Sequence, residues 1–296
     1  MKVGLIDVDS KIPNLALMKI AAYHKSLGDQ ISFYSPLFDK PDLVYASKVF
    51  KFSDDYLYYP SHCDVIKGGS GYGLDNVLPK EIENICPDYD LYNEPYAMGF
   101  CTRGCIRSCG FCIVPKKEGR IRATSDIYEF LNGREYFMLM DSNLTAEPDH
   151  FERICKQLIK HRVNTYFSQG LDIRLMDADK ADLLNRVRPW DGKRIHFAWD
   201  FMADEQAVKE GIQLVTKYIK PHKIMFYVLI GWDTTEDEDL YRVELLRSYK
   251  IMPFVMPYDK FDYYQRSFAR WVNHKAIFNS CSWPEYRKKL KGAMVV

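Results

Sequence analysis

The stretch YAMGFCTRGCIRSCGFC, residues 96–112, decides the fold of this chain, because it joins a short apolar run to a tight group of cysteines. Residues 96–100 are apolar and short enough to form a buried strand. Within the twelve residues that follow lie four of the eight cysteines of the chain: Cys101, Cys105, Cys109 and Cys112. In a reducing compartment, such spacing indicates a metal site rather than disulfides. We therefore expect a buried strand that ends at a metal-binding loop.

The spacing of Cys105, Cys109 and Cys112 favours an iron-sulfur cluster. Three thiolates bind three corners of a 4Fe-4S cluster and leave the fourth iron open for a cofactor or substrate. Zinc would favour two close pairs of ligands, and no second Cys-x-x-Cys pair occurs in the sequence. A zinc site and a group of ordinary buried cysteines remain the alternatives. Cys101 ends the apolar strand and is more simply a buried small residue, although as a fourth ligand it would close the cluster.

Outward from this stretch, apolar strand-like runs alternate with helical stretches. The expected strands are residues 96–100, 136–140, 165–168, 194–199, 223–230 and 253–257. Strands that alternate with helices predict a parallel sheet. Right-handed crossovers would curl it into a partial (β/α)6 barrel of the TIM type, with its ligand site at the carboxyl ends of the strands. Thr235 and Glu238 predict a capping box at the start of the fifth helix.

The amino-terminal part predicts a second, smaller α/β domain of Rossmann-like type. Its expected strands are residues 1–6, 30–34, 42–46 and 64–67, with a helix at residues 15–27. The glycine-rich run at residues 68–73 either lets the backbone approach a ligand or forms a plain surface loop, because it lacks the spacing of a dinucleotide fingerprint.

The predicted division of the chain therefore has four parts. They are a Rossmann-like domain at residues 1–78, a linker at 79–95, a barrel at 96–269 and a helical tail at 270–296. In the tail, Trp271 and Trp283 are expected to pack inward.

Composition narrows the class of protein. Lys and Arg number 41 against 40 Asp and Glu, so the net charge of +1 gives no general field for nucleic acid or an anionic membrane. A polynucleotide substrate is neither indicated nor excluded. Asp7 comes too early for a signal peptide, and no apolar run approaches the roughly 18 residues that span a bilayer. We expect a cytoplasmic protein without a membrane partner.

The cysteine motif resembles the signature of the radical S-adenosylmethionine (radical SAM) superfamily. In that signature Cys-x-x-x-Cys-x-x-Cys follows the first strand of a partial barrel, and an aromatic residue, here Phe111, precedes the last cysteine. The flanking stretches, residues 103–105, 111–115 and 118–120, resemble those of methylthiotransferases and cobalamin-dependent radical SAM enzymes. Both subfamilies carry an α/β domain before the barrel.

The sequence also departs from both subfamilies. Methylthiotransferases have three cysteines in the first domain, where this chain has only Cys63 and Cys86. They also usually end in an RNA-binding β-barrel, and we expect the residues after the predicted barrel to be too few for one. The Asp-x-His-x-x-Gly motif of many cobalamin domains is absent too.

The resemblance implies a 4Fe-4S cluster and SAM as cofactors, and its cobalamin-dependent branch implies cobalamin. The open iron would hold SAM, whose reductive cleavage gives a 5′-deoxyadenosyl radical that takes hydrogen from a substrate. The substrate would be a small molecule, a peptide or a nucleoside, and the electron donor a protein such as flavodoxin or ferredoxin. Alternatives are cobalamin-dependent or methylthiotransferase-like modification of a nucleoside or tRNA, a closed-cluster electron-transfer or sensor protein, and a zinc-stabilised binding module.

The resemblance further implies SAM contacts at the ends of the strands. Asp141 would accept from the methionine amino group, and Ser168 or Gln169 would contact the ribose. Phe111, within the cluster loop, would also contact SAM. Arg174 would pair with the methionine carboxylate.

The resemblance also gives Gly231 a role, and two further features have two interpretations each. Gly231 would allow close approach of the adenine ring, as in the apolar segment it resembles. Asp172 and Arg174 fit a salt bridge that caps the next helix as well as they fit a ligand contact. A basic run beside the cysteine loop would receive an anionic group of the substrate, although solvated charge is its default interpretation; it comprises Lys116, Lys117, Arg120 and Arg122.

Overall fold

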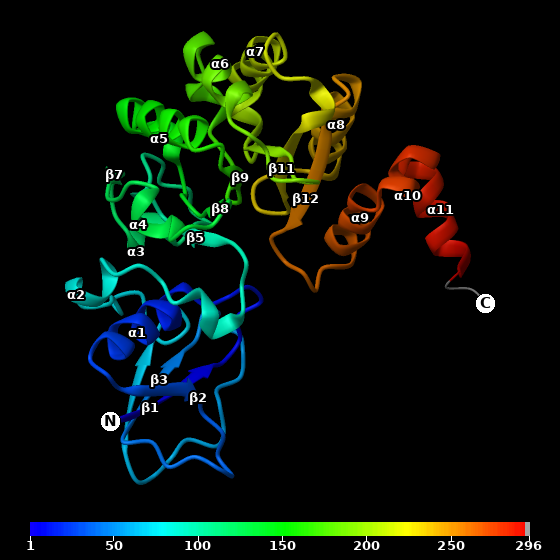
Figure 1. The fold of residues 1–296 in the computed structure, drawn as a ribbon. Helices are drawn as coiled ribbons and strands as arrows, with labels where there is room; N and C mark the ends of the chain where they lie inside the picture. Colours follow the sequence, from blue (N-terminus) through cyan, green and yellow to red (C-terminus); the bar gives the residue numbers. More distant parts are fainter. Residues whose placement is uncertain (294–296) are drawn as a thin grey trace.

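The amino-terminal unit is a four-stranded parallel sheet with one helix. The structure, a computed structural model, describes the backbone of residues 1–293 (Figure 1). Its first elements are β1 (Lys2–Asp7), α1 (Leu15–Ser26), β2 (Gln30–Phe33), β3 (Leu43–Ser47) and β4 (Asp64–Gly68). The strands are all parallel, in the order β2-β1-β3-β4. Every strand predicted in this part of the chain is confirmed.

The two faces of this sheet are covered differently. On one face Leu5 of β1 packs against Leu17 and Ile20 of α1. On the other face Ile6 and its buried neighbours pack against tyrosines of the loop between β3 and β4 rather than against a helix. The unit is therefore a small sheet with a helix on one side and irregular chain on the other.

Residues 79–95 connect this sheet to the rest of the chain and pack against both. They form α2 (Lys80–Glu83) and the 3-10 turn η1 (Tyr89–Tyr92). Tyr92 donates a hydrogen bond to Asp7 of β1. Tyr89 is buried and donates to the carbonyl of Phe130, beyond β5. The segment predicted as a linker is thus fixed at both ends.

The second unit holds six parallel strands in two groups of three. The first group is β5 (Ala97–Gly99), β8 (Tyr136–Leu139) and β9 (Asn164–Phe167); the second is β10 (Ile195–Ala198), β11 (Ile224–Ile230) and β12 (Met252–Pro257). All neighbours within a group are parallel. The six predicted strands and the α/β class are confirmed.

The predicted barrel is not confirmed as one continuous sheet. β9 and β10 belong to separate sheets, and two isolated bridges lie beside them: Thr165 of β9 to Pro189, before β10, and Leu171, after β9, to Phe197 of β10. The cause is the chain before β10: Thr165 donates to the carbonyl of Arg188 and accepts from the amide of Trp190. This segment takes the hydrogen-bonding edge of β9 that β10 would otherwise use.

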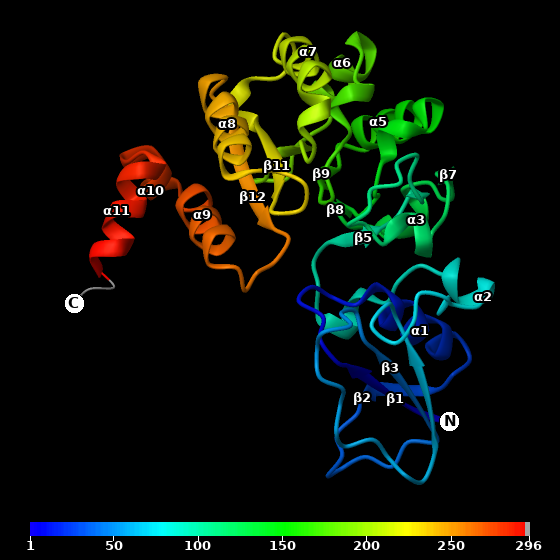
Figure 2. The ribbon, with the colours of Figure 1, turned by 180° about the vertical axis from the view of Figure 1, so that it is seen from behind.

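Helices cover the outer side of the six strands (Figures 1 and 2). They are α5 (Pro148–Lys160), α6 (Ala178–Arg186), α7 (Glu205–Val215) and α8 (Glu236–Ser248). Along β11, Phe226 and Val228 are buried while Tyr227 between them is partly exposed, as alternation along a strand requires. The capping box of Thr235 and Glu238 at the start of α8 is confirmed.

The chain continues through three helices, α9 (Tyr263–Asn273), α10 (Lys275–Ser280) and α11 (Trp283–Ala293). Trp271 is fully buried and Trp283 nearly so, with their ring centres 5.6 Å apart. Their inward packing is therefore confirmed. Among residues 1–293, no helix has the length and apolar character needed to cross a bilayer.

Candidate functional site

The cysteine loop begins directly after β5 and is closed by the residues that follow it. Two-residue strands β6 (Thr102–Arg103) and β7 (Arg122–Ala123) pair antiparallel across its base. The amide of Cys105 donates to the carbonyl of Gly119 at 3.2 Å, and the amide of Cys112 donates to the carbonyl of Cys109 at 3.0 Å. These bonds hold both ends of the loop in place.

The thiols of Cys105, Cys109 and Cys112 are half-buried and near enough to one another for Cys105 to affect the pKa of the other two. Burial raises the pKa of Cys109 and Cys112, and the neighbouring thiols raise it further. The sulfur of Cys105 accepts hydrogen bonds from the amide of Arg107 at 3.3 Å and from Nδ2 of Asn143 at 3.5 Å. Metal binding would have to displace the protons that these raised pKa values favour.

Cys101 lies apart from this group. Its side chain is fully buried in the main hydrophobic core, where burial raises its pKa well above the usual value. This placement agrees with its interpretation as a small core residue.

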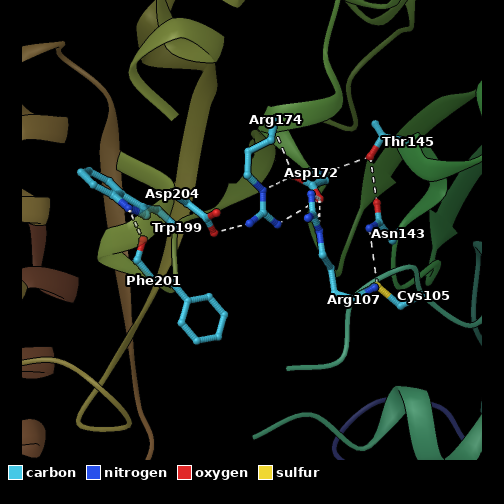
Figure 3. A network of polar contacts seen from close by, with 9 residues as sticks. All are labelled: Cys105, Arg107, Asn143, Thr145, Asp172, Arg174, Trp199, Phe201 and Asp204. Atoms are coloured by element: carbon cyan, nitrogen blue, oxygen red, sulfur yellow. Dashed lines mark hydrogen bonds and ion pairs between the residues drawn. The ribbon is translucent and has the colours of Figure 1, made fainter. Parts of the chain in front are cut away.

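A buried carboxylate joins two arginines next to the loop (Figure 3). Asp172 has a side chain only 6% exposed, and it accepts from Nε and Nη2 of Arg107 at 3.2 and 3.0 Å. It also accepts from Nε and Nη2 of Arg174 at 2.7 and 3.0 Å. Burial would raise the pKa of Asp172, but the hydrogen bonds and charges of the two arginines outweigh it and hold that pKa below its ordinary value.

Asp172 also caps the following 3-10 turn, η3 (Ile173–Leu175), by accepting from the amide of Arg174. The salt-bridge interpretation of Asp172 and Arg174 is therefore confirmed. Arg174 pairs in addition with Asp204. To bind a methionine carboxylate, Arg174 would have to share or exchange these two acidic partners.

A chain of hydrogen bonds runs from the first thiol to this carboxylate (Figure 3). Asn143 donates to Cys105 and accepts from the hydroxyl of Thr145 at 2.9 Å. The same hydroxyl accepts from the amide of Asp172 at 3.1 Å. The polar chain thus ties Cys105 to the ends of β8 and β9, and such second-layer bonds orient metal ligands.

Aromatic rings border the other side of the loop. The ring of Phe111 lies 5.7 Å from that of Phe201 and 6.0 Å from that of Trp232. The ring of Trp232 lies 4.7 Å from that of Tyr258. A Cβ atom on Gly110 would come within 2.9 Å of Trp232, so the glycine allows this close packing.

Asp200, after β10, is a second carboxylate near the thiols. It accepts from the amide of Leu229 at 3.2 Å, and burial raises its pKa. Its charge contributes to the raised pKa of Cys109 and Cys112. Trp199, the residue before it, is buried and donates to the carbonyl of Phe201.

Asp141 does not face an open site, contrary to the expected acceptor role. Its side chain is buried and accepts from both the amide and the hydroxyl of Thr102, the latter at 2.7 Å. Its second oxygen, Oδ2, is buried without a hydrogen-bond partner. Burial raises the pKa of Asp141 to about 6. The residue anchors the start of the cysteine loop, and its contact with the methionine amino group stays a prediction.

Three further predicted SAM contacts lie near the ends of the strands and differ in their exposure: Ser168, Gln169 and Gly231. The hydroxyl of Ser168 donates to the carbonyl of Leu139 at 2.8 Å, and Gln169 is exposed beside it. Gly231 has a φ of +78°, and a Cβ atom there would lie 2.1 Å from the side chain of Gln265. That side of Gly231 is filled by protein, and its contact with adenine stays a prediction, as do the SAM contacts of Ser168, Gln169 and Phe111.

Sequence reasoning did not identify Arg107, Thr145 and Asp204 as parts of the site. Arg107 stands inside the cysteine motif, and a charged residue between metal ligands is a signal that could have marked it. Thr145 and Asp204 carry no such mark, because their roles depend on partners 27 and 30 residues away in the sequence.

The donor set fits the predicted cluster in chemistry. Three half-buried thiols within eight residues, one with N–H donors at its sulfur, match a cluster that is held at three corners. Within the described part of the chain, no three His, Cys, Asp or Glu side chains are grouped closely enough to hold a single metal ion.

Comparison with known proteins shows a similarity in fold. No family model matches the sequence, and no curated protein matches it either. Among solved structures, the chain is similar to a radical S-adenosylmethionine methyltransferase, TsrM, from Kitasatospora setae, determined with cobalamin and a [4Fe-4S] cluster bound. The TM-score is 0.63 at 11% identity, over 86% of this chain and 72% of that one. At this identity the likeness shows the fold: an α/β chain with parallel sheets like those of that enzyme.

Proposed function

We propose that this chain is a radical SAM enzyme in which Cys105, Cys109 and Cys112 hold a 4Fe-4S cluster. The observation that carries the proposal is the group of three half-buried thiols directly after the first strand of a six-strand parallel unit. The likeness in fold to a radical SAM methyltransferase supports it. When bound, the cluster and SAM would supply a 5′-deoxyadenosyl radical that abstracts hydrogen from a substrate.

The residues of the chain prepare the place where this chemistry would occur. The polar chain from Cys105 to Asp172 fixes the first thiol, and the Asp172 carboxylate neutralises Arg107 beside it. The rings of Phe111, Phe201 and Trp232 form an apolar border beside the loop. Arg174, held between Asp172 and Asp204, offers a guanidinium for a carboxylate.

The test is anaerobic reconstitution with iron and sulfide, followed by reduction with dithionite in the presence of SAM and chromatography for 5′-deoxyadenosine. We expect the wild type to form a cluster and 5′-deoxyadenosine, and the triple Cys105, Cys109 and Cys112 to Ala variant to form neither. Cys101→Ala is the matched control, since Cys101 is buried in the core. A cluster that is lost in Cys101→Ala, without SAM cleavage by the wild type, would overturn the proposal in favour of a closed electron-transfer cluster.

Cobalamin-dependent methylation is the second candidate, favoured by the cobalamin in the similar structure. The Cβ positions of two glycines of the run in the first unit, Gly69 and Gly71, are filled by protein rather than open to a ligand. Cβ atoms on Gly69 and Gly71 would lie 2.3 and 2.5 Å from Lys48, so these glycines are needed for packing against that residue. Absorption spectra after incubation with hydroxocobalamin and removal of excess ligand test this candidate. Retention of a stoichiometric corrinoid supports it, and a colourless apoprotein contradicts it.

A further inference from the structure

The segment that closes the cysteine loop carries positive charge that nothing nearby neutralises. Residues 113–122 contain Lys116, Lys117, Arg120 and Arg122 but a single acid, Glu118. Glu118 is turned inward: its carboxylate pairs with Arg103 and accepts from the amide of Gly104. In the part of the chain that the structure describes, none of the four cations belongs to an ion pair; Arg122 donates to the main-chain carbonyl of Glu118.

These charges lie next to the thiols. Lys116 follows Cys112 by four residues, which limits the distance between their Cα atoms to about 14 Å. At the other end, the carbonyl of Gly119 accepts from the amide of Cys105, and a Cβ atom on Gly104 would lie 2.3 Å from the carbonyl oxygen of Arg120. The basic segment therefore borders the loop at both ends.

Two isoleucines beside the thiols in sequence are also exposed. Ile106, between the first two thiols, is 48% exposed, and Ile113, directly after the last thiol, is 49% exposed. Apolar side chains surrounded by charge are typical of a protein interface, in which the charges guide encounter and the apolar groups become buried. A nucleic-acid surface needs the cations but not the isoleucines, and the net charge of +1 gives no wider basic field. The observations therefore favour a protein partner.

We propose that this surface, which we name the basic collar (Ile106, Ile113, Lys116, Lys117, Arg120 and Arg122), is the docking face for an acidic electron-donor protein. The inference rests on the proposed function, which needs one electron for each cleavage of SAM. In the docked complex the donor is oxidised by one electron and the cluster is reduced by one electron, with no group transferred. The basic collar places the donor at the thiols, where the path for the electron is short.

The test compares a protein donor with a small chemical one. In the double variant Lys116→Glu, Arg120→Glu, two exposed cations of the basic collar are reversed. The matched control is Lys217→Glu, Lys220→Glu, which changes the net charge equally at exposed positions just before β11, at the opposite ends of the strands. Cluster bleaching is followed by stopped flow with reduced flavodoxin, an acidic protein, and separately with dithionite, at low and high salt.

We expect the basic-collar variant to lose at least about tenfold in the rate of bleaching by flavodoxin at low salt, which is the scale of electrostatic steering. Its rate with dithionite should stay within about twofold of the wild type, and the control variant should resemble the wild type with both donors. High salt should slow the wild type with flavodoxin but leave the variant nearly unchanged.

Equal flavodoxin rates for the variant and the wild type would overturn the inference. A parallel loss with dithionite would also overturn it, because it would show that the basic collar serves the cluster itself. A third result would instead assign the basic collar to nucleic acid. In that case the variant would lose turnover of an RNA substrate with dithionite as the reductant, while its rate of bleaching by flavodoxin would be unchanged. Failure of the proposed function would be recognised by a different result: the cluster would be reduced in the presence of SAM, but no 5′-deoxyadenosine would form.

Discussion

Two glycines occupy matching positions in the two units, and the loops beyond them differ. Gly69 follows β4 with a φ of +92°, and a Cβ atom there would lie 2.3 Å from the carbonyl oxygen of Lys48. Gly104 follows β6 with a φ of +86°, and a Cβ atom would lie 2.3 Å from the carbonyl oxygen of Arg120. In each case only glycine allows two main-chain segments to touch. A glycine after a strand thus does not by itself indicate a ligand site.

The loops that follow Gly69 and Gly104 differ in the side chains they carry and in the residues that hold them. After Gly69, the amide of Gly71 donates back to the carbonyl of Lys48, so the loop closes on its own sheet. After Gly104 the chain presents three thiols, and the buried carboxylate of Asp172, from outside the loop, binds Arg107 of the loop together with Arg174. The second loop is therefore held by hydrogen bonds to residues from distant parts of the chain, whereas the first is held by its own sheet.

The largest effect should come from removing the carboxylate that fixes the second loop. Asp172→Ala leaves Arg107 and Arg174 facing each other without an anion, and we expect a loss of about 3 kcal/mol in the free energy of unfolding at neutral pH. Because the pKa of Asp172 is lowered in the folded state, its stabilising effect is present above about pH 4 and is lost as the pH falls further. Urea unfolding measures both.

Asp182→Ala is the control for that variant. Its pair with Arg186 is exposed, at 3.5 Å within one helix, and its removal should cost under about 0.5 kcal/mol. Equal losses in the two variants would contradict the view that the second loop depends on a buried ionic partner.

Asp141 allows a second test of the same loop through pH. Burial raises its pKa from an ordinary value of 3.8 to about 6, so between these values the folded chain holds a proton that the unfolded chain has released. Stability should therefore fall as the pH rises through this window, by on the order of 3 kcal/mol at most. Asp141→Asn keeps an acceptor for Thr102 and should show no such fall.

The measurement is the free energy of unfolding from pH 4.5 to pH 8. Asp90→Asn serves as the control, because its side chain is 87% exposed. If Asp141→Asn and the wild type have parallel pH profiles, Asp141 is not a buried ionisable anchor.

Alanine at the two glycines compares the units directly. Gly69→Ala and Gly104→Ala should each cost about 2 kcal/mol, because the positive φ and the contact with a carbonyl add together. Gly28→Ala measures the cost of the positive φ alone, because Gly28 has a φ of +81° and nothing lies within 4 Å of its Cβ position. We expect this variant to lose about 1 kcal/mol in the free energy of unfolding.

The functional readout of the glycine variants is cluster content after reconstitution. We expect Gly104→Ala to lower it by shifting Cys105, whereas Gly69→Ala should leave it unchanged in the folded protein. Equal cluster content in both variants would remove the distinction between the loops.

The fold could be predicted from the sequence where local pattern decides structure. Each expected strand is present, and Thr235 caps α8 as its spacing with Glu238 predicts. The interruption between β9 and β10 could not be predicted, because periodicity marks a strand but not which segment takes its free edge. Residues 188–190 take that edge of β9 through the main chain alone.

The candidate site could be predicted only in part. The thiols were found because their spacing is local. Asp141 stands at the end of a strand, as expected for a ligand contact, yet its side chain turns to Thr102, 39 residues earlier. Arg107 and Asp172 are 65 residues apart, and their pairing follows from the three-dimensional arrangement rather than from a pattern.

The smallest expected effect concerns the contact between the two units. Lys260, after β12, lies with its Nζ 4.0 Å from the ring centre of Phe52 in the first unit, and Phe52 is 70% exposed. A cation above an exposed ring contributes about 0.5–1 kcal/mol, so Lys260→Ala should lower the free energy of unfolding by no more than this, and Lys260→Arg should restore it. Urea unfolding tests both variants. A loss above about 2 kcal/mol, or a changed slope of the free energy of unfolding against urea concentration, would contradict this prediction. Either result would show that the folding of the two units depends on the contact between Lys260 and Phe52.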